Sequence, residues 1–303
     1  MNLVVGATGL MGAEVCARLV SQHQPVRALV RTTSEPGKVR HLHTLGVNTV
    51  VGDLRDRRSL DVACSGITAV IATASSMPFA YDPARNTPDT TDRDGMQNLI
   101  AAARVARVQH FVLTSFSGAI DADFPLRNAK RAAEDHLRNS GVPFTILRPN
   151  FFMEVWLSLA VGFDYAHGRV KVYGEGTNPI EWIAVPDVAR YAIASVDHPA
   201  ARNATVELGG PDALSPLEVI ALFERVGGRT FAVEHVAPEE IAAQEAAATD
   251  PMQRSFAALM RAYARGAVQD SALQREFLMR PTSVEEYAKR VVSPWEGLLQ
   301  ARR

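Results

Sequence analysis

A glycine-rich stretch near the N-terminus has residue types and spacing suited to binding phosphate. It follows a short apolar run at residues 3–5 and reads Gly6-Ala7-Thr8-Gly9-Leu10-Met11-Gly12. Glycines at this spacing permit a tight turn, let a pyrophosphate approach the backbone, and allow a helix to pack closely on a strand. The amide groups and dipole of the helix that begins here would bind the phosphates. The stretch predicts a dinucleotide-binding loop; the alternative is a glycine-rich turn without a ligand.

The residue after the next apolar run indicates which dinucleotide would bind. That run covers residues 26–30, and Arg31 follows it. An NAD site usually has an Asp or Glu there, about 20 residues past the glycines, to bind the ribose 2′-hydroxyl. A guanidinium can instead pair with a 2′-phosphate and stack on adenine. We therefore expect NADP(H) to be preferred over NAD(H), although Arg31 would also suit a solvated strand end.

Two later strand ends supply further candidates for contact with the cofactor. Asp53 could accept a hydrogen bond from the adenine amino group, or serve as an ordinary turn residue. Small residues after the fourth apolar run would let a cofactor lie across the sheet. These two places predict the cofactor-binding residues Asp53, Leu54, Thr73, Ala74 and Ser75.

The elements that must position these residues alternate between short apolar runs and helical patterns. The runs lack a clean polar–apolar alternation, as is typical of parallel strands buried on both faces. They lie at residues 3–5, 26–30, 49–51, 69–72, 111–114 and 144–147. This rhythm over about 150 residues predicts an α/β fold with a doubly wound parallel Rossmann sheet.

After Pro149 the pattern changes to a smaller, mainly helical C-terminal substrate lobe. Late strands are expected at residues 183–185 and 205–208, whereas 168–179 looks like a loop. Capping boxes at Ser215–Glu218 and Ser283–Glu286 predict two helix starts. The expected nucleotide domain is 1–150 with 183–208 added, and the expected lobe is 151–182 with 209–303.

These residues together resemble the NmrA-like family, a branch of the atypical short-chain dehydrogenases/reductases. The resemblance covers about the first 230 residues and is looser beyond them. It implies a Rossmann domain, bound NADP(H), and a cleft beneath the C-terminal lobe. Some members of the family reduce quinones, enones, ketones or phenylpropanoid ethers, and others are regulators that sense the dinucleotide. The matching stretches are residues 4–12, 26–31, 52–54, 111–115, 130–134, 140–154, 183–189 and 209–218.

Lys130 is the main catalytic candidate. Short-chain dehydrogenases usually pair a proton-donating tyrosine with a lysine four residues later. Here Leu126 stands in the tyrosine place, and no other Tyr-x-x-x-Lys occurs in the chain. The resemblance implies that Lys130 acts alone, on the nicotinamide ribose or on the substrate. The alternative is a surface lysine paired with Glu134 at i+4.

Ser115 and the segment after the sixth strand complete the predicted site. Ser115 could donate a hydrogen bond to a substrate carbonyl, or satisfy local turn amides. The resemblance places Pro149, Asn150 and Phe151 near the nicotinamide, where they would contact the cofactor. Aromatic and apolar residues could shape the substrate pocket, with core packing as the alternative. They are Met77, Phe79, Tyr81, Trp156 and Tyr165.

Composition and charge narrow the functional classes. The chain has 303 residues, with 32 Lys and Arg against 33 Asp and Glu. This near balance argues against nucleic acid or an anionic membrane as a partner. The apolar runs are too short to span a bilayer, and no Cys/His cluster has metal-ligand spacing. Cys16 and Cys64 lie in apolar helical stretches, which suggests reduced thiols and a cytoplasmic location.

The sequence therefore predicts an NADPH-dependent oxidoreductase. It would transfer hydride to a small, flat, mostly apolar carbonyl, quinone or enone, as a monomer or homodimer. The alternative is a non-catalytic NADP(H)-sensing regulatory protein, for which the missing tyrosine would be the signature. An isomerase or dehydratase that uses the cofactor catalytically would fit the same fold.

Overall fold

A parallel seven-stranded sheet forms the centre of the larger half of the molecule in this computed structural model, which describes residues 1–77, 80–120 and 122–300. The strand order is β3-β2-β1-β4-β5-β6-β10, and every neighbouring pair is parallel. Chain order reverses at β1 and β4, which places a crevice between their carboxyl ends. The strands are β1 (Asn2–Val5), β2 (Val26–Val30), β3 (Asn48–Val51), β4 (Ala69–Ala72), β5 (His110–Thr114), β6 (Phe144–Pro149) and β10 (Ala204–Leu208).

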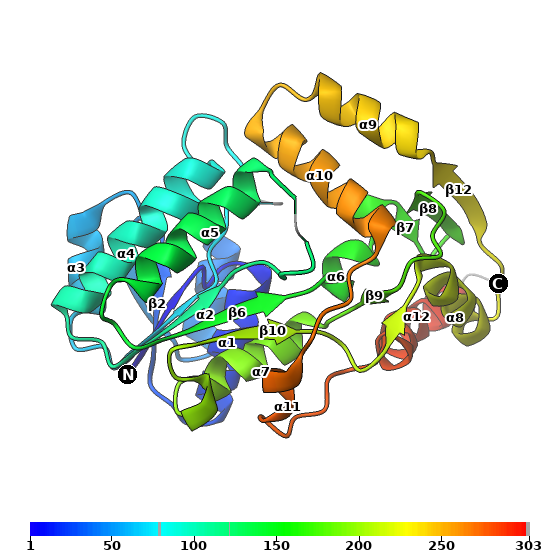
Figure 1. Cartoon of the computed structure of the whole chain (residues 1–303). Helices are drawn as coiled ribbons and strands as arrows, with labels where there is room; N and C mark the ends of the chain where they lie inside the picture. The colour runs from blue at the N-terminus through cyan, green and yellow to red at the C-terminus, as the bar shows by residue number, and fades with distance from the viewer. Residues whose placement is uncertain (78–79, 121, 301–303) are drawn as a thin grey trace.

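Helices cover both faces of this sheet, which confirms the doubly wound prediction (Figure 1). One face packs on α1 (Leu10–Ser21), α2 (Pro36–Thr44) and α7 (Val185–Ala194). The other packs on α3 (Arg57–Cys64), α4 (Asp94–Val105) and α5 (Pro125–Arg138). The central strands β1, β4 and β5 are buried along their whole length, so they need apolar residues at successive positions, which explains their unbroken apolar runs. Cys16 and Cys64 are buried on opposite faces and unbonded.

The C-terminal lobe lies beside the main sheet (Figure 1), and its core contains a cluster of aromatic side chains. A small sheet, β12-β8-β7, and a two-stranded pair, β11-β9, lie among its helices. The strands are β7 (Phe163–Asp164), β8 (Arg169–Tyr173), β9 (Ile180–Glu181), β11 (Ala213–Leu214) and β12 (Ala232–Val236). The helices are α6 (Met153–Trp156), α8 (Pro216–Gly227), α9 (Pro238–Ala247), α10 (Pro251–Arg265), α11 (Ala272–Arg275) and α12 (Val284–Gln300), with α11 packed on β10 of the main sheet.

The strand expected at residues 183–185 is wrong. Ile183 forms only an isolated bridge to Phe152, and Val185 already begins α7. A short apolar run does not distinguish a strand from a buried helix start. Pro186 lies in the first turn of α7, where proline is favourable, and it therefore favours the helix over a strand.

The strand β8 lies within residues 168–179, for which the sequence pattern predicts a loop. Its sequence alternates, with Val170 and Val172 buried and Arg169 and Lys171 exposed. This period of two is the signal of a half-buried strand, and the glycines on either side obscured it. Both predicted capping boxes are confirmed: Ser215 and Glu218 bond reciprocally at the start of α8. Ser283 and Glu286 do the same before α12.

Within the described part of the chain, no helix is long and apolar enough to cross a membrane. The same residues contain no group of three or more His, Cys, Asp or Glu side chains arranged to hold a metal ion.

Candidate nucleotide and active site

The glycine loop joins β1 to α1 at the point where strand order reverses. Gly6 has φ +89°, and a Cβ there would lie 2.6 Å from the backbone nitrogen of Ala74. A Cβ on Gly12 would lie 2.2 Å from the carbonyl oxygen of Gly6. These two glycines are therefore required for the close packing of α1, β1 and the end of β4.

Gly9 differs from the other two glycines. A Cβ there would meet only the Gly6 carbonyl oxygen, at 3.2 Å. Gly9 is also the N-cap of α1 and has no side chain to accept from the amides of the first turn. Leu10, the first residue of that turn, is 52% exposed. The loop thus presents uncapped N–H groups beside open space, which fits a phosphate-bearing dinucleotide.

Alanine substitutions should separate the two roles of the glycines. Gly12→Ala should destabilise the fold strongly, because its Cβ overlaps a backbone oxygen that cannot move freely. Gly9→Ala should leave the unfolding midpoint nearly unchanged but weaken NADPH binding roughly tenfold or more, the effect of crowding a backbone–phosphate contact. Urea unfolding and fluorescence titration with NADPH measure the two effects. Equal losses of stability in both variants would contradict this division.

The residues after β4 are only partly available to a ligand. The Thr73 hydroxyl donates to the Val5 carbonyl at 3.0 Å, which ties β4 to β1. Ala74 and Ser75 are half-buried. The Ser75 hydroxyl oxygen accepts from the Met77 amide at 3.4 Å. Of these predicted residues, Thr73 joins two strands and Ala74 lies against Gly6 of the glycine loop.

Arg31 and Asp53 lie at the neighbouring strand ends, and a second arginine joins them. Arg31 has an exposed side chain, and its backbone is fixed by a turn in which its amide donates to the Ser34 hydroxyl. Asp53 accepts from the guanidinium of Arg55 at 2.9 and 2.7 Å. This hydrogen-bonded pair lowers the pKa of Asp53, and the charge of Arg31 contributes to the lowering. The corner therefore holds two guanidinium groups and one neutralised carboxylate.

Arg55 was not predicted from the sequence. Its position two residues after Asp53 was the available signal, since the Arg55 amide also donates to that carboxylate at 2.9 Å. Leu54, between them, is buried, and its carbonyl accepts from Asn98. Its side chain thus packs against the protein, with Cβ near Gly95.

Lys130 is buried at the carboxyl end of β5. Its side chain is 9% exposed, and Nζ lies 3.1 Å from Asp92 Oδ1 and 3.4 Å from the Thr114 carbonyl oxygen. The alternative of a surface lysine paired with Glu134 is therefore wrong. The Phe116 ring centroid lies 5.9 Å from the ammonium.

Thr114 connects this lysine to the glycine loop. Its carbonyl accepts from Lys130, and its hydroxyl lies 3.7 Å from the sulfur of Met11, in the first turn of α1. The structure thus brings the predicted phosphate loop and the predicted catalytic lysine together. Leu126, in the tyrosine place, is 2% exposed and lies in the core of the C-terminal lobe. Its amide donates to Ser255 of α10.

Ser115 takes part in a buried charge network. Its hydroxyl donates to Glu134 at 2.5 Å. Glu134, fully buried, also accepts from Arg131, Arg138 and Arg148. The single hydroxyl proton of Ser115 is therefore used in the hydrogen bond to Glu134 and does not point into an open pocket.

The environment of Glu134 has two opposing effects on its pKa. Burial alone would raise it, but hydrogen bonds from Arg148 and Ser115 and the charge of Arg131 outweigh burial, so the pKa lies below its ordinary 4.5. A carboxyl group with a lowered folded pKa stabilises the fold above its unfolded pKa, and this contribution is lost as the pH falls.

Glu134→Gln should lower the free energy of unfolding by about 1.5–2 kcal/mol at pH 7, the usual scale for hydrogen bonds to charged groups. The three arginines retain some solvent contact, which limits the loss. Wild type is more stable than the variant only while its carboxylate is ionised. The difference in the free energy of unfolding between the two should therefore become smaller as the pH falls below about 4.5. Urea unfolding at pH 7 and at about pH 4 measures the difference, with Glu175→Gln, at an exposed glutamate, as control. A constant difference across that range would show that the charge is not the cause.

The segment after β6 is packed into the lobe. Asn150 is 3% exposed, and its side-chain amide nitrogen donates to the Ala267 carbonyl at 2.8 Å. Phe151 lies edge-on against Trp156, with ring centroids 4.6 Å apart. Pro149 ends β6 and is buried.

Most of the proposed pocket residues also have packing contacts. Met77 and Trp156 belong to the core of the lobe, Tyr165 packs against it, and Tyr81 is half-buried. Phe79 lies outside the described residues. The structure therefore gives Met77, Trp156 and Tyr165 a packing role.

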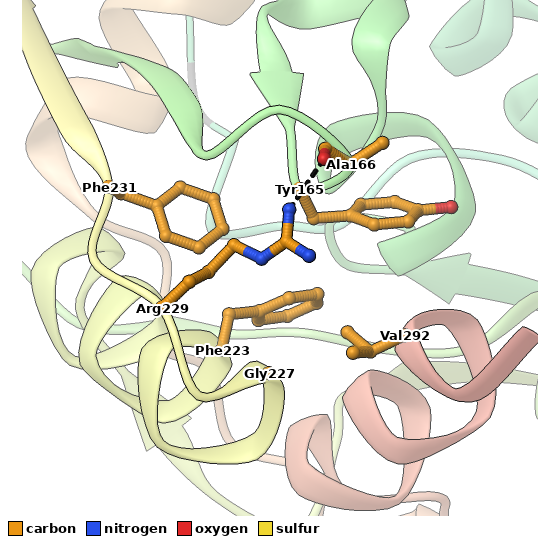
Figure 2. Close-up of a pocket in the computed structure, with 7 residues that line it drawn as sticks. All are labelled: Tyr165, Ala166, Phe223, Gly227, Arg229, Phe231 and Val292. Atoms are coloured by element: carbon orange, nitrogen blue, oxygen red, sulfur yellow. Dashed lines mark hydrogen bonds between the residues drawn. The ribbon is translucent and has the colours of Figure 1, made fainter. Parts of the chain in front are cut away.

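A small cavity of about 10 Å³ lies elsewhere, inside the C-terminal lobe (Figure 2). The Arg229 guanidinium lies among aromatic rings there and donates to the Ala166 carbonyl at 2.6 Å. This volume holds about one water molecule. None of its lining residues belongs to the glycine loop or the Lys130 cluster, so the cavity is not part of the candidate site.

Comparison with known proteins identifies the family. The NmrA-like family model matches residues 2–288. The NAD(P)H azoreductase of Xenophilus azovorans is 34% identical over 232 residues, covering 76% of this chain and 74% of the relative. A (4-alkanoyl-5-oxo-2,5-dihydrofuran-3-yl)methyl phosphate reductase of Streptomyces griseus is 34% identical over 238 residues, covering 78% and 77%. The NADPH-dependent quinone oxidoreductase QOR2 of Escherichia coli, solved with NADPH, has a TM-score of 0.76 at 21% identity and covers 96% and 99%. The chain therefore belongs to the NmrA-like family of NAD(P)H-dependent oxidoreductases.

Proposed function

We propose that this protein is an NADPH-dependent reductase that transfers hydride to a small, flat, mostly apolar carbonyl, quinone or enone. The observation that carries the proposal is the ammonium of Lys130, held at the carboxyl end of β5 and joined through Thr114 to the first turn of α1. Only Thr114 separates this ammonium from the phosphate-binding loop in space. A cation at that place could act on the reacting end of a dinucleotide bound across the sheet. The reductase relatives support the same reaction class.

The chain's own residues would hold the cofactor at three places. The uncapped amides at the start of α1 would bind the pyrophosphate, with Gly9 leaving room for it. Arg31 would pair with the 2′-phosphate, while Arg55 keeps the nearby Asp53 carboxylate neutralised. Lys130 would donate to the nicotinamide ribose or to the acceptor.

Bound NADPH would supply the hydride. As hydride reaches a carbonyl, quinone or enone, negative charge grows on the acceptor oxygen, and an adjacent ammonium stabilises that charge. Leu126 offers no acid, so the proton that completes the reduction would come from water or from Lys130 itself. The acceptor would lie beneath the apolar core of the C-terminal lobe. Such surroundings suit a flat, weakly polar molecule.

Steady-state oxidation of NADPH with a panel of acceptors tests the proposal. The panel should include a quinone, a conjugated enone, a flat aromatic ketone and an azo dye. We expect saturable turnover with at least one acceptor, and a higher kcat/KM for NADPH than for NADH. Tight NADPH binding without turnover of any acceptor would overturn the proposal and favour a dinucleotide-sensing protein.

A further inference from the structure

Asp92 is a buried carboxylate next to the proposed catalytic lysine, and no motif in the sequence indicates it. It is 1% exposed and lies in a single π-helical turn, η1 (Pro88–Arg93), that leads into α4. Single π-helical turns are rare and often occur at functional sites. The turn brings Asp92 between the residues that follow β4 and the helix that carries Lys130.

The two oxygens of Asp92 have different partners. Oδ2 accepts from the amide of Ser76 at 3.0 Å and from its hydroxyl at 2.6 Å. Oδ1 is buried and accepts no hydrogen bond among the residues described, yet it lies 3.1 Å from Nζ of Lys130. One side of the carboxylate is thus fixed to the backbone, and the other faces the ammonium.

We propose that Asp92 is a positioning residue for Lys130, held in place by Ser76. This inference rests on the proposed function, in which Lys130 acts on the cofactor or the acceptor. A lysine side chain is flexible, and an unpaired ammonium in this buried place would be costly. Asp92 supplies the counter-charge, and Thr114 supplies a carbonyl acceptor. The ion pair with Asp92 and the hydrogen bond to Thr114 fix the ammonium, which has three N–H donors and so keeps at least one for the ribose or the acceptor oxygen.

Asp92→Asn is the variant that tests this role. Asparagine keeps an oxygen for Ser76 and removes the charge that faces Lys130. The variant should lower kcat about tenfold or more, the scale seen for partners that orient an active-site group, with little change in KM for the acceptor. It should weaken NADPH binding severalfold and leave the binding of 2′,5′-ADP unchanged, because that fragment lacks the nicotinamide ribose.

Asp187→Asn is the matched control. Asp187 is also 1% exposed and is paired with Arg190 at 3.0 Å, on α7 across the sheet. This variant should lose stability but keep kcat and NADPH affinity. If Asp92→Asn does not fold, Ser76→Ala leaves the carboxylate in place, removes one of its donors, and should give a smaller loss of kcat in the same direction.

A double-mutant cycle with Lys130→Met separates the possible outcomes. If Asp92 acts through Lys130, the double variant should be no slower than Lys130→Met alone. The proposal is overturned if Asp92→Asn lowers kcat by the same factor with and without Lys130, or leaves both kcat and NADPH affinity unchanged. If Lys130→Met itself changes neither quantity, the failure lies in the proposed role of Lys130. If no acceptor is reduced, the comparison of NADPH with 2′,5′-ADP tests the positioning role by binding alone.

Discussion

Replacing Lys130 by methionine should lower kcat by about 100-fold or more for any acceptor that the protein reduces, the usual scale for losing one preorganised electrostatic contact. Methionine keeps the length and apolar stem of the side chain and removes its charge. Since the ammonium stabilises charge that grows during hydride transfer, the loss should fall more on kcat than on KM for the acceptor.

Stopped-flow and steady-state kinetics on the same preparation measure this effect. Lys171→Met is the control, because Lys171 is an exposed lysine on β8 that pairs with Glu234. Lys171→Met should behave as wild type. Turnover that stays unchanged in Lys130→Met would mean that Lys130 has a structural role with Asp92 and Thr114 only.

Arg31→Ala should weaken NADPH binding by about 1.5–3 kcal/mol and leave NADH binding nearly unchanged, as expected for the loss of one charge-assisted phosphate contact. The side chain of Arg31 is exposed at the end of β2, beside the neutralised Asp53–Arg55 pair. Removing it should therefore affect the ligand more than the fold.

Paired titrations with NADPH and NADH, on wild type and variant, check this expectation. Arg104→Ala removes an exposed arginine from the last turn of α4, which leads into the amino end of β5, and should change neither affinity. The assignment of Arg31 is refuted if wild type binds the two cofactors equally.

The sheet and its glycine loop could be predicted because their signals are local. Each strand is a short apolar run, and the loop carries its glycines within seven residues of sequence. The structure adds the reason for two of the glycines: Gly6 and Gly12 are required by the contact between α1, β1 and β4.

The partners of the site residues could not be predicted, because they are distant in sequence or depend on a rare turn. Asp92 contacts Lys130 because it lies in a π-helical turn, and no residue pattern in the sequence predicts that turn. Glu134 was placed with Lys130 by i+4 spacing, but that spacing does not reveal burial. Its strongest partner outside α5 is Arg148, which lies on β6 and meets it only in the folded sheet.

Hydride should leave NADPH within this site, and deuterated cofactor shows whether it does. The rate of acceptor reduction should be measured with NADPH carrying deuterium on one face of nicotinamide C4, and then on the other. We expect a primary isotope effect with one of the two forms under single-turnover conditions, and recovered NADP⁺ from that form that has lost its deuterium. Reduction with no isotope effect and full retention of deuterium from both forms would show that the hydride does not come from NADPH.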